Sequence, residues 1–409
     1  MLDSKARLRS MQRREFIAGS LAATLAASHG AWAEKASAPL VDVAAVDRAR
    51  VLKAAQAYLR EQPRTLTSVQ SPRSTGGVHD YFSEGDYWWP DEKDPEGPYV
   101  RRDGYSNPAN FNAHRELLIR FSVQMPALTA AYVLTRKRVY AEHAAAHLRA
   151  WFVAPATRMN ANLEHAQAIH GVTPGRGVGI IDTLHLVEVA RAAMWLEHAG
   201  VLSAADLSAI RSWFGEYLAW MMASKNGQEE RDAKNNHGTC WVAQYAAFAA
   251  YVGDAERLAW ARERYREHLI PEQVAPDGRL PLELARTKPY SYSLFNMDVL
   301  AICCQILSEG QSGVDDLWRF ATSKGQGIAK VVAFMEPYIR EKAKWPFAHD
   351  VEYFDDLPVR QPSLLFAGLA YGDRSYLELW ARLNPDPTVA EIIRNFPVRQ
   401  PVLWVSRPG

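Results

Sequence analysis

Two polar segments carry the side chains whose types and spacing could do chemistry. The first, Asn235-Asn236-His237, leads directly into an apolar stretch, so two amides and an imidazole stand at the predicted start of a helix. Free backbone N–H groups at such a position favour anions. The second, residues 280–296, contains Arg286 and Tyr292 and leads into another apolar helix. Taken singly, Asn235 or Asn236 can be an N-cap and His237 an ordinary helix-start residue.

Together, the two segments supply what β-elimination of a uronate requires. The C6 carboxylate must be neutralised so that the C5 proton can leave, a base must remove that proton, and an acid must protonate the C4 leaving oxygen. Asn236 and Arg286 can hold the carboxylate, the arginine through a bidentate fork. Tyr292 can serve as base and acid if Arg286 and a protonated His237 lower its pKa from about 10. A neutral His237 can instead take the C5 proton from the opposite face.

Helices must position these groups, because apolar residues recur mostly at helical spacing from about Val41 onward. Residues 117–132 and 140–151 form one predicted hairpin, and further helical stretches cover 182–199, 204–224, 238–252, 255–269, 293–308, 327–340 and 361–384. Consecutive antiparallel pairs without a strict repeat of about 34 or 40 residues favour an α/α toroid over a repeat solenoid. We therefore predict an all-α, single-domain toroid over residues 34–409, an incomplete barrel of about six or seven helix pairs.

A long loop between about residues 71 and 112 is rich in Gly, Pro, Asp and aromatic residues. A loop of that length within a compact domain is usually functional. We expect it to form a lid or a wall of the cleft at one end of the toroid.

The overall composition excludes some classes of function. Lys and Arg total 47 against 46 Asp and Glu, and this balance argues against nucleic-acid binding. An acidic polysaccharide or oligosaccharide can still bind a locally basic cleft. The three cysteines, Cys240, Cys303 and Cys304, have no metal-type spacing and predict no zinc site. We expect no catalytic metal and no cofactor, because organic groups can neutralise the carboxylate, and a structural ion is left open.

The N-terminus has the pattern of an export signal. Arg13-Arg14 precede an apolar, Ala-rich run, and Ala31-Trp32-Ala33 supplies the small residues that a signal peptidase needs. This order predicts a twin-arginine-type signal peptide over residues 1–33, rather than a helix of the folded domain. The mature protein is then expected in the periplasm or secreted, with no membrane attachment after cleavage.

The motifs also carry a family resemblance. Asn-Asn-His before a helix, followed by Glu-Leu-x-Arg and a Tyr-Ser-x-Phe-Asn segment, resembles the alginate lyase superfamily over about residues 75–380. It is most similar to the glucuronan and alginate lyases of polysaccharide lyase family thirty-eight. The resemblance implies substrate-carboxylate and catalytic roles for Asn236 and His237, charge stabilisation for Arg286 and the acid/base role for Tyr292. Tyr290, outside the tyrosine match, is a substrate-binding candidate instead.

Other segments are expected to contribute substrate subsites. Residues 86–90 and 101–105 of the long loop resemble the family's Trp-Trp-Pro and Arg-Asp-Gly pattern. The tryptophans can stack on sugar rings, or anchor the loop by burial. Residues 175–179, Gly-Arg-Gly-Val-Gly, are not a dinucleotide fingerprint, because no predicted strand precedes them. The substrate-binding candidates besides Tyr290 are Trp88, Trp89, Arg102, His114, Gln167, His170 and Asn235, each with a capping or core role as the structural alternative.

Two other classes of function remain open from the sequence. A glycoside hydrolase on a similar toroid would need catalytic carboxylates, and the candidates are Asp182, Glu283, Asp350 and Asp355. Glu283 more plausibly orients Arg286 or a helix terminus. A non-catalytic periplasmic glycan-binding helical protein would use the same motifs as caps. Which uronate is bound, whether cleavage is endo or exo and the oligomeric state are left open, because loop geometry decides them.

Overall fold

The computed structural model describes residues 40–406, which belong to one compact unit. The predicted signal peptide, residues 1–33, lies outside the described residues. Helices dominate the described chain, and its few strands are short. The predicted all-α toroid is confirmed.

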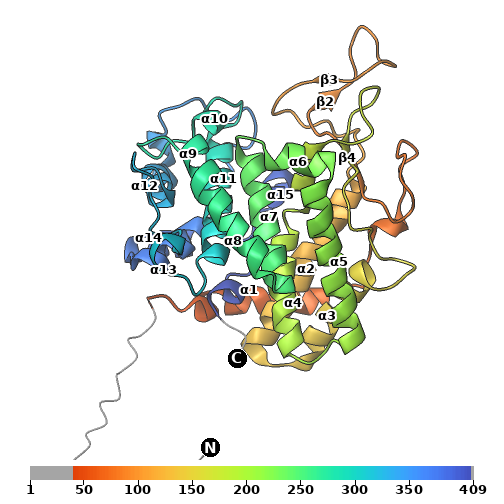
Figure 1. Cartoon of the computed structure of the whole chain (residues 1–409), viewed down its shortest axis with the longest axis horizontal. Coiled ribbons are helices and arrows are strands. Elements are labelled where there is room, and N and C mark those ends of the chain that lie inside the picture. The colour runs from red at the N-terminus through yellow and green to blue at the C-terminus, as the bar shows by residue number, and fades with distance from the viewer. Residues whose placement is uncertain (1–39, 407–409) are drawn as a thin grey trace, which may run out of the picture. The chain divides into compact units, whose positions relative to one another are not determined.

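The toroid has an inner row of helices, each packed on the next (Figure 1). This row consists of α2 (Ala113–Thr135), α4 (Leu186–His198), α7 (Asn236–Val252), α11 (Pro289–Leu307) and α13 (Pro362–Tyr371). Each is followed in the chain by a second helix: α3 (Arg138–Phe152), α5 (Ala204–Ala223), α8 (Ala255–Arg264), α12 (Ile328–Arg340) and α14 (Arg374–Arg382). The alternation of inner and following helices is the α/α architecture that the sequence predicted.

The remaining α-helices complete the unit. They are α1 (Val43–Tyr58), α6 (Lys225–Arg231), α9 (Ile270–Gln273), α10 (Pro281–Leu284), α15 (Ala390–Arg394) and α16 (Val402–Val405), with a 3-10 segment η2 (Gly177–Thr183) before α4 and a π-helical segment (Tyr265–Leu269) after α8. The C-terminal helix α16 packs on α1, α2 and α4.

Local sequence explains where the main helices begin and end. Asn235 caps α7, because its side chain accepts a hydrogen bond from the backbone N–H of His237, and Gly253 ends the helix at φ 80°. Ser203 forms a capping box at α5. Gly372 adopts φ 70° and divides the predicted helix 361–384 into α13 and α14. The predicted helix 182–199 starts later, at Leu186, because 177–183 form η2.

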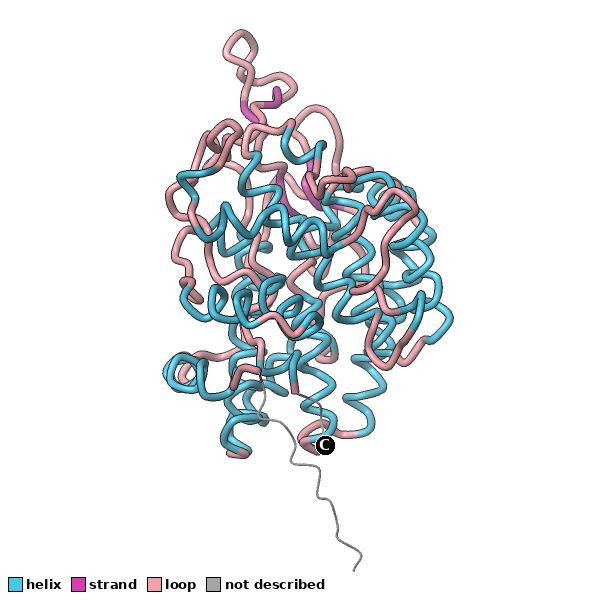
Figure 2. Tube along the Cα trace, turned by 90° about the vertical axis from the view of Figure 1, so that its left-hand side faces the viewer, coloured by secondary structure: helices cyan, strands magenta, loops and turns pink. Residues whose placement is uncertain are grey.

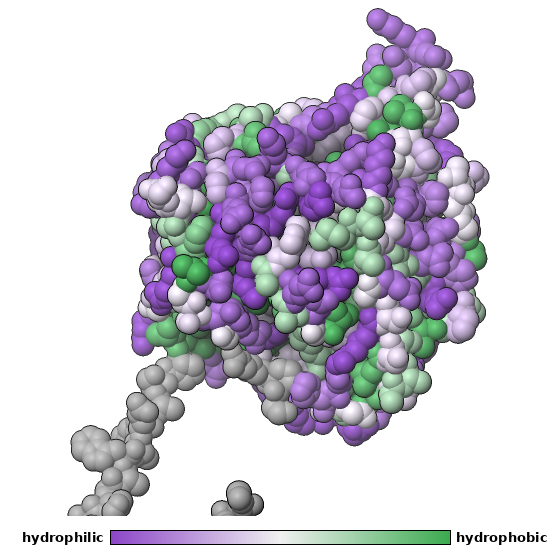
Figure 3. All heavy atoms as spheres, in the orientation of Figure 1, coloured by the Kyte–Doolittle hydropathy of each residue, from purple (hydrophilic) through white to green (hydrophobic). Residues whose placement is uncertain are grey.

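The core is filled by large aromatic rings between Ala-rich helices. Trp151, Trp241 and Trp380 are among the largest fully buried side chains. On α7 nearly every position is buried, which fits a helix with neighbours on all sides: α4, α5, α8 and α11. Helix α2 is long and apolar enough to cross a membrane, but 61% of its apolar window is buried within the fold, as in the core helix of a globular domain. The face drawn in Figure 3 is mostly hydrophilic.

The long loop takes part in two small two-stranded sheets. Strand β1 (Phe82–Glu84) pairs in parallel with β4 (His165–Ala168), with Phe82 opposite His165. Strand β2 (Trp88–Trp89) pairs antiparallel with β3 (Val100–Arg101), and this ribbon projects from one end of the helices (Figures 1 and 2). The predicted lid or cleft wall therefore lies at one end of the toroid.

Candidate active site

A cavity of about 300 Å³ lies where the long loop meets the helix starts. Residues from the long loop, from the start of α7, from the first turn of α11, from the segment around η2 and from the C-terminal part of the chain line it. Its charged lining side chains include four arginines and two aspartates: Arg101, Arg176, Arg286, Arg394, Asp86 and Asp182. The cavity is therefore locally basic although the chain as a whole is nearly neutral.

Asn236 is held at the start of α7 by a buried carboxylate. Glu283 of α10 accepts hydrogen bonds from the Asn236 backbone N–H and side-chain Nδ2, both at 2.7 Å. Asn296 of α11 donates to the same carboxylate at 3.1 Å. Burial raises the pKa of Glu283, although these hydrogen bonds oppose it. Glu283 therefore fixes the terminus of α7 and the Asn236 amide, one of the two roles expected for it.

His237 is oriented by a second buried carboxylate. Its Nδ1 lies 2.6 Å from Oε1 of Glu230, on α6, and the Glu230 side chain is only 1% exposed. The carboxylate accepts a hydrogen bond from the Nδ1–H group. His237 lines the cavity, and Nε2 is its ring nitrogen without a protein partner among the described residues. His237 is thus set up either to donate to an anion or to accept a proton through Nε2.

Arg286 is clamped to the long loop. Its Nη2 and Nε donate to the carboxylate of Asp103 at 2.9 and 3.2 Å, and Thr287 donates to the same carboxylate at 3.0 Å. Although burial acts in the opposite direction, the hydrogen bonds and charge of Arg286 lower the pKa of Asp103 to about 2. The ion pair joins the loop wall to the segment before α11 and fixes the plane of the guanidinium.

Tyr292 stands in the first turn of α11 and meets two partners. Its hydroxyl lies 2.8 Å from the hydroxyl of Tyr87 and accepts a hydrogen bond from Arg286 Nη2 at 3.2 Å. Burial raises the pKa of Tyr292, although Arg286 and Tyr87 act to lower it. The predicted lowering of this pKa by cationic neighbours is therefore outweighed by desolvation, and the resting residue is a neutral phenol.

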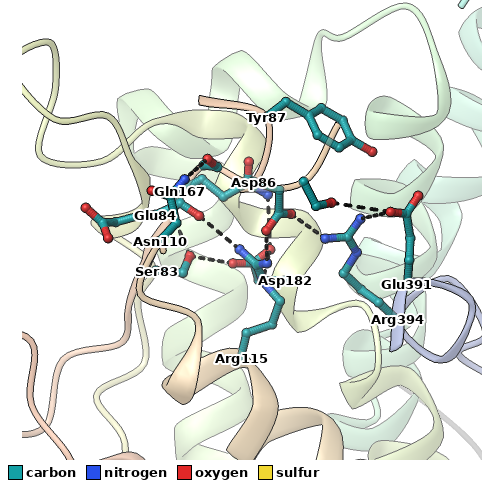
Figure 4. A network of polar contacts seen from close by, with 12 residues as sticks. Ser83, Glu84, Asp86, Tyr87, Asn110, Arg115, Gln167, Asp182, Glu391 and Arg394 are labelled. Atoms are coloured by element: carbon teal, nitrogen blue, oxygen red, sulfur yellow. Dashed lines mark hydrogen bonds and ion pairs between the residues drawn. The ribbon is translucent and has the colours of Figure 1, made fainter. Parts of the chain in front are cut away.

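A buried network of charges supports the loop beneath these groups (Figure 4). Arg115 of α2 and Arg394 of α15 both pair with Asp86, and Arg115 Nε lies 3.2 Å from Asp182 Oδ1. Hydrogen bonds from Tyr81 and Ser83 also reach Asp182. Arg394 also lies 3.8 Å from Glu391. The network ties segments far apart in the chain to the base of the cavity.

Several predicted site residues meet in the cavity. Asn236, His237, Arg286 and Tyr292 all line it, as do the substrate-binding candidates Asn235, Gln167 and Trp88. Asn235 is also the N-cap of α7, the structural alternative given for it.

The other substrate-binding candidates lie elsewhere. His114 is buried, and its ring nitrogens lie 3.0 Å from the Phe82 backbone N and 2.8 Å from the Val69 carbonyl. Tyr290 is buried and donates to the Tyr338 carbonyl at 3.0 Å. Trp89 and Arg102 belong to the projecting ribbon, and the guanidinium lies 5.3 Å from the indole centroid. His170 packs on Tyr99. His114 and Tyr290 therefore have the core role given as their structural alternative, whereas Trp89, Arg102 and His170 make packing contacts outside the lining of this cavity.

The carboxylates proposed for a hydrolase have structural partners. Asp182 belongs to the arginine network, and Glu283 holds Asn236. Asp350 accepts the backbone N–H groups of Tyr290 and Ser291, and so caps α11. Asp355 is fully exposed beside Lys342. In the part of the chain that the structure describes, no group of three or more His, Cys, Asp or Glu side chains is arranged to hold a metal ion.

Sequence reasoning missed several residues that complete the site: Tyr87, Asp103, Arg176, Glu230 and Arg394. Tyr87 and Asp103 fall within the two loop segments that were singled out, so the signal for them was present. Glu230 and Arg394 sit in ordinary helical sequence, and only the folded chain brings them to the cavity.

Comparison with known proteins agrees with this geometry. The family model for alginate lyase matches residues 65–345. An alginate lyase from Bacteroides ovatus has 30% sequence identity and a TM-score of 0.76, and the match covers 91% of this chain and 95% of that one. No curated protein sequence matches the chain.

More distant solved structures share the fold. Alginate lyase A1-III, as a histidine-to-alanine variant complexed with a tetrasaccharide, has 16% identity and a TM-score of 0.57, and the match covers 91% of this chain and 98% of that one. A tyrosine-to-phenylalanine variant of A1-III, also complexed with a tetrasaccharide, has 15% identity and a TM-score of 0.51, with 91% and 99% covered.

The helical toroid and the family match together place the chain in the class of polysaccharide lyases. Within that class, the chain belongs to the alginate lyase family.

Proposed function

We propose that this protein cleaves a polyuronate, either glucuronan or alginate, by β-elimination. The observation that carries the proposal is the meeting of Asn236, His237, Arg286 and Tyr292 in one basic cavity. The sequence places them in two segments that fold onto different helices. Their convergence supplies every group that the elimination needs.

In the proposed reaction, Asn236, His237 and Arg286 hold the C6 carboxylate of the sugar whose linkage breaks. Their charge and hydrogen bonds stabilise the negative charge that develops when the C5 proton leaves. The C5–H electron pair then forms the C4–C5 double bond, and the C4–O bond breaks with its electrons on the leaving oxygen. Because Glu283 and Asp103 fix two of the three donors, little reorganisation is needed when this charge appears.

Tyr292 is proposed to protonate the leaving oxygen. A buried phenol whose pKa is raised remains protonated at neutral pH, which is the state an acid needs. When the C5 hydrogen faces α11, the phenol first gives its proton to solvent. The phenolate, beside the Arg286 guanidinium, then takes the C5 proton and passes it to the leaving oxygen. A C5 hydrogen on the opposite face goes instead to Nε2 of a neutral His237, whose Nδ1 is held by Glu230. In that case Asn236 and Arg286 alone hold the carboxylate. Guluronate has the opposite configuration at C5 from mannuronate and glucuronate, so the choice of base follows the substrate.

Two further parts of the proposal concern subfamily and location. The Tyr-Ser-x-Phe-Asn segment supports placement with the glucuronan and alginate lyases of polysaccharide lyase family thirty-eight. The twin-arginine-type pattern in residues 1–33 supports export to the periplasm or beyond. The tetrasaccharide complexes of A1-III support an oligosaccharide or polysaccharide as the substrate.

One assay tests the reaction type. The purified protein is incubated separately with alginate, glucuronan and a neutral glucan, and both the ultraviolet absorbance of unsaturated uronate ends and the number of reducing ends are followed. New reducing ends with matching absorbance, from a polyuronate only, are expected. Reducing ends without absorbance would mean hydrolysis, and binding without either product would mean a glycan-binding protein. Either result would overturn the proposal.

A further inference from the structure

Arg176 differs from the other arginines around the cavity in having no acidic partner. Arg101, Arg286 and Arg394 all form ion pairs with aspartates. Arg176 lines the same cavity, yet it forms no ion pair within residues 40–406. The charges of Asp182, Glu230 and Asp86 reach it only from beyond ion-pair distance. A half-buried cation without a direct ion pair is costly unless something else neutralises it.

The Arg176 side chain is nevertheless held in place. Its Nε donates to the Gln167 carbonyl at 2.9 Å, and its Nη2 donates to Gln167 Oε1 at 3.0 Å. Gln167 is fixed in turn, because its Nε2 donates to Asp182 at 3.1 Å. These contacts use one edge of the guanidinium and leave Nη1 without a protein acceptor among the described residues. The arginine is therefore positioned before any ligand arrives.

The backbone around this contact is built for close approach. Gln167 adopts φ 49°, a left-handed conformation that is strained for a residue other than glycine. Arg176 lies between two glycines that have no room for a side chain. A Cβ on Gly175 would lie 1.9 Å from the Glu164 carbonyl oxygen, and one on Gly177 would lie 2.7 Å from the Asn226 carbonyl oxygen. The Gly-Arg-Gly-Val-Gly segment is thus tightly packed against neighbouring backbone, and it places Arg176 at the cavity.

Trp88 gives this part of the cavity an apolar surface. Its indole lines the cavity, and its ring centroid lies 5.7 Å from Cζ of Arg176. Burial and the neighbouring Arg101 lower the pKa of Arg176 to about 10, so the guanidinium is still charged at neutral pH. Because the guanidinium lies over the indole ring, a charged and an apolar surface adjoin here, which suits a sugar ring that carries a carboxylate.

We propose that Arg176 binds the carboxylate of a second uronate, next to the one whose linkage breaks. The inference rests on the proposed function, since Asn236, His237 and Arg286 already account for the first carboxylate. Arg176 reaches the cavity from a different element, η2 and the residues before it, and a polyuronate offers one carboxylate on every sugar. The protein then selects chains in which two neighbouring sugars are charged.

Binding measurements test this subsite separately from catalysis. Tyr292→Phe serves as the background, so that the probe stays intact. The probes are a tetramer of uronate residues and the same tetramer with its carboxylates reduced to alcohols, and dissociation constants are measured by calorimetry. Adding Arg176→Gln should raise the Kd for the charged tetramer by about ten- to a hundredfold, the usual loss for one hydrogen-bonded charge. The neutral tetramer should bind both proteins alike.

Two further variants make the outcome decisive. Arg176→Lys keeps the charge without the planar fork and should lie between the background and Arg176→Gln. Arg211→Gln removes an equal charge from the surface of α5, where Arg211 pairs with Glu197, and should change neither constant. Circular dichroism and the melting temperature report whether each variant is folded.

The results also separate this inference from the proposed function. An unchanged Kd for the charged tetramer in Arg176→Gln, or an equal loss for the neutral tetramer, would overturn the subsite. A native protein that binds the tetramer through Arg176 but forms no unsaturated product would keep the subsite and reject the lyase reaction. No binding of the charged tetramer to the Tyr292→Phe protein would overturn the subsite as well.

Discussion

The hydroxyl oxygens of Tyr87 and Tyr292 lie 2.8 Å apart, although 205 positions separate the two residues in the chain. One stands on the long loop and the other in the first turn of α11. The contact therefore joins the loop wall to the residue proposed as the acid. The long loop completes the site as well as covering it.

Removing the Tyr292 hydroxyl should abolish elimination. We expect Tyr292→Phe to lower kcat by about a hundred- to ten-thousandfold, the usual contribution of a positioned acid or base. The initial rate of unsaturated product formation measures this. Tyr251→Phe is the matched control, since Tyr251 is also a buried tyrosine but does not line the cavity. A Tyr292→Phe protein within tenfold of the native rate would refute the assignment.

Removing the Tyr87 hydroxyl should have a smaller effect that depends on pH. The hydrogen bond from Tyr87 acts to lower the pKa of Tyr292, so its loss should raise that pKa further. In Tyr87→Phe, we expect any limb of the pH–rate profile that reports Tyr292 to move to higher pH, with kcat reduced by about tenfold. Profiles of kcat from acid to alkaline pH measure the shift. An unshifted profile would mean that Tyr87 only packs against the site.

Replacing Glu230 should disturb His237 without touching the substrate. Glu230→Gln removes the carboxylate that favours a proton on Nδ1, so Nε2 no longer has a fixed protonation state. We expect kcat to fall by at least about tenfold, most strongly for the uronate whose C5 hydrogen faces His237. Rates on separate mannuronate, guluronate and glucuronate polymers measure this. Glu229→Gln is the control, because Glu229 is exposed and pairs only loosely with Lys225, at 3.7 Å.

Glu188 should make stability depend on pH. Its buried carboxylate accepts the backbone N–H groups of Arg399 and Gln400, and burial raises its pKa from 4.5 to about 7 although these hydrogen bonds oppose the rise. Since the folded pKa is the higher one, its favourable contribution is complete below pH 4.5 and is lost as pH rises through about 7.

The variant Glu188→Gln cannot ionise, so the fall in the free energy of unfolding across this interval should become shallower. Denaturant titrations at several pH values between these limits measure the slope. A slope equal to that of the native protein would show that other groups cause it. Asp298, whose pKa burial also raises to about 7 against hydrogen bonds from Ser363, would then be the next residue to replace.

Much of this protein could be predicted from local sequence. Helix periodicity placed the inner and outer helices to within a few residues, except where Gly372 divided one stretch and η2 shortened another. The segments with Asn236, His237, Arg286 and Tyr292 were recognisable because each precedes an apolar helix. A polar residue at a helix start has a position and direction that the helix itself dictates.

Only the tertiary structure decided which side chains meet. Asp103 reaches Arg286 across 183 positions, Glu283 reaches Asn236 across 47, and Arg394 reaches Asp86 across 308. The tertiary structure also decided the direction of the pKa shift of Tyr292. Burial raises this pKa, and Tyr87 of the long loop lies against the Tyr292 hydroxyl. Periodicity and capping depend on residues within a few turns of one helix, whereas burial and ion pairing depend on segments that the folded core brings together. The sequence therefore determined the helices and the candidate groups, and the packing of the loop and the C-terminal segment against the toroid made them into a site.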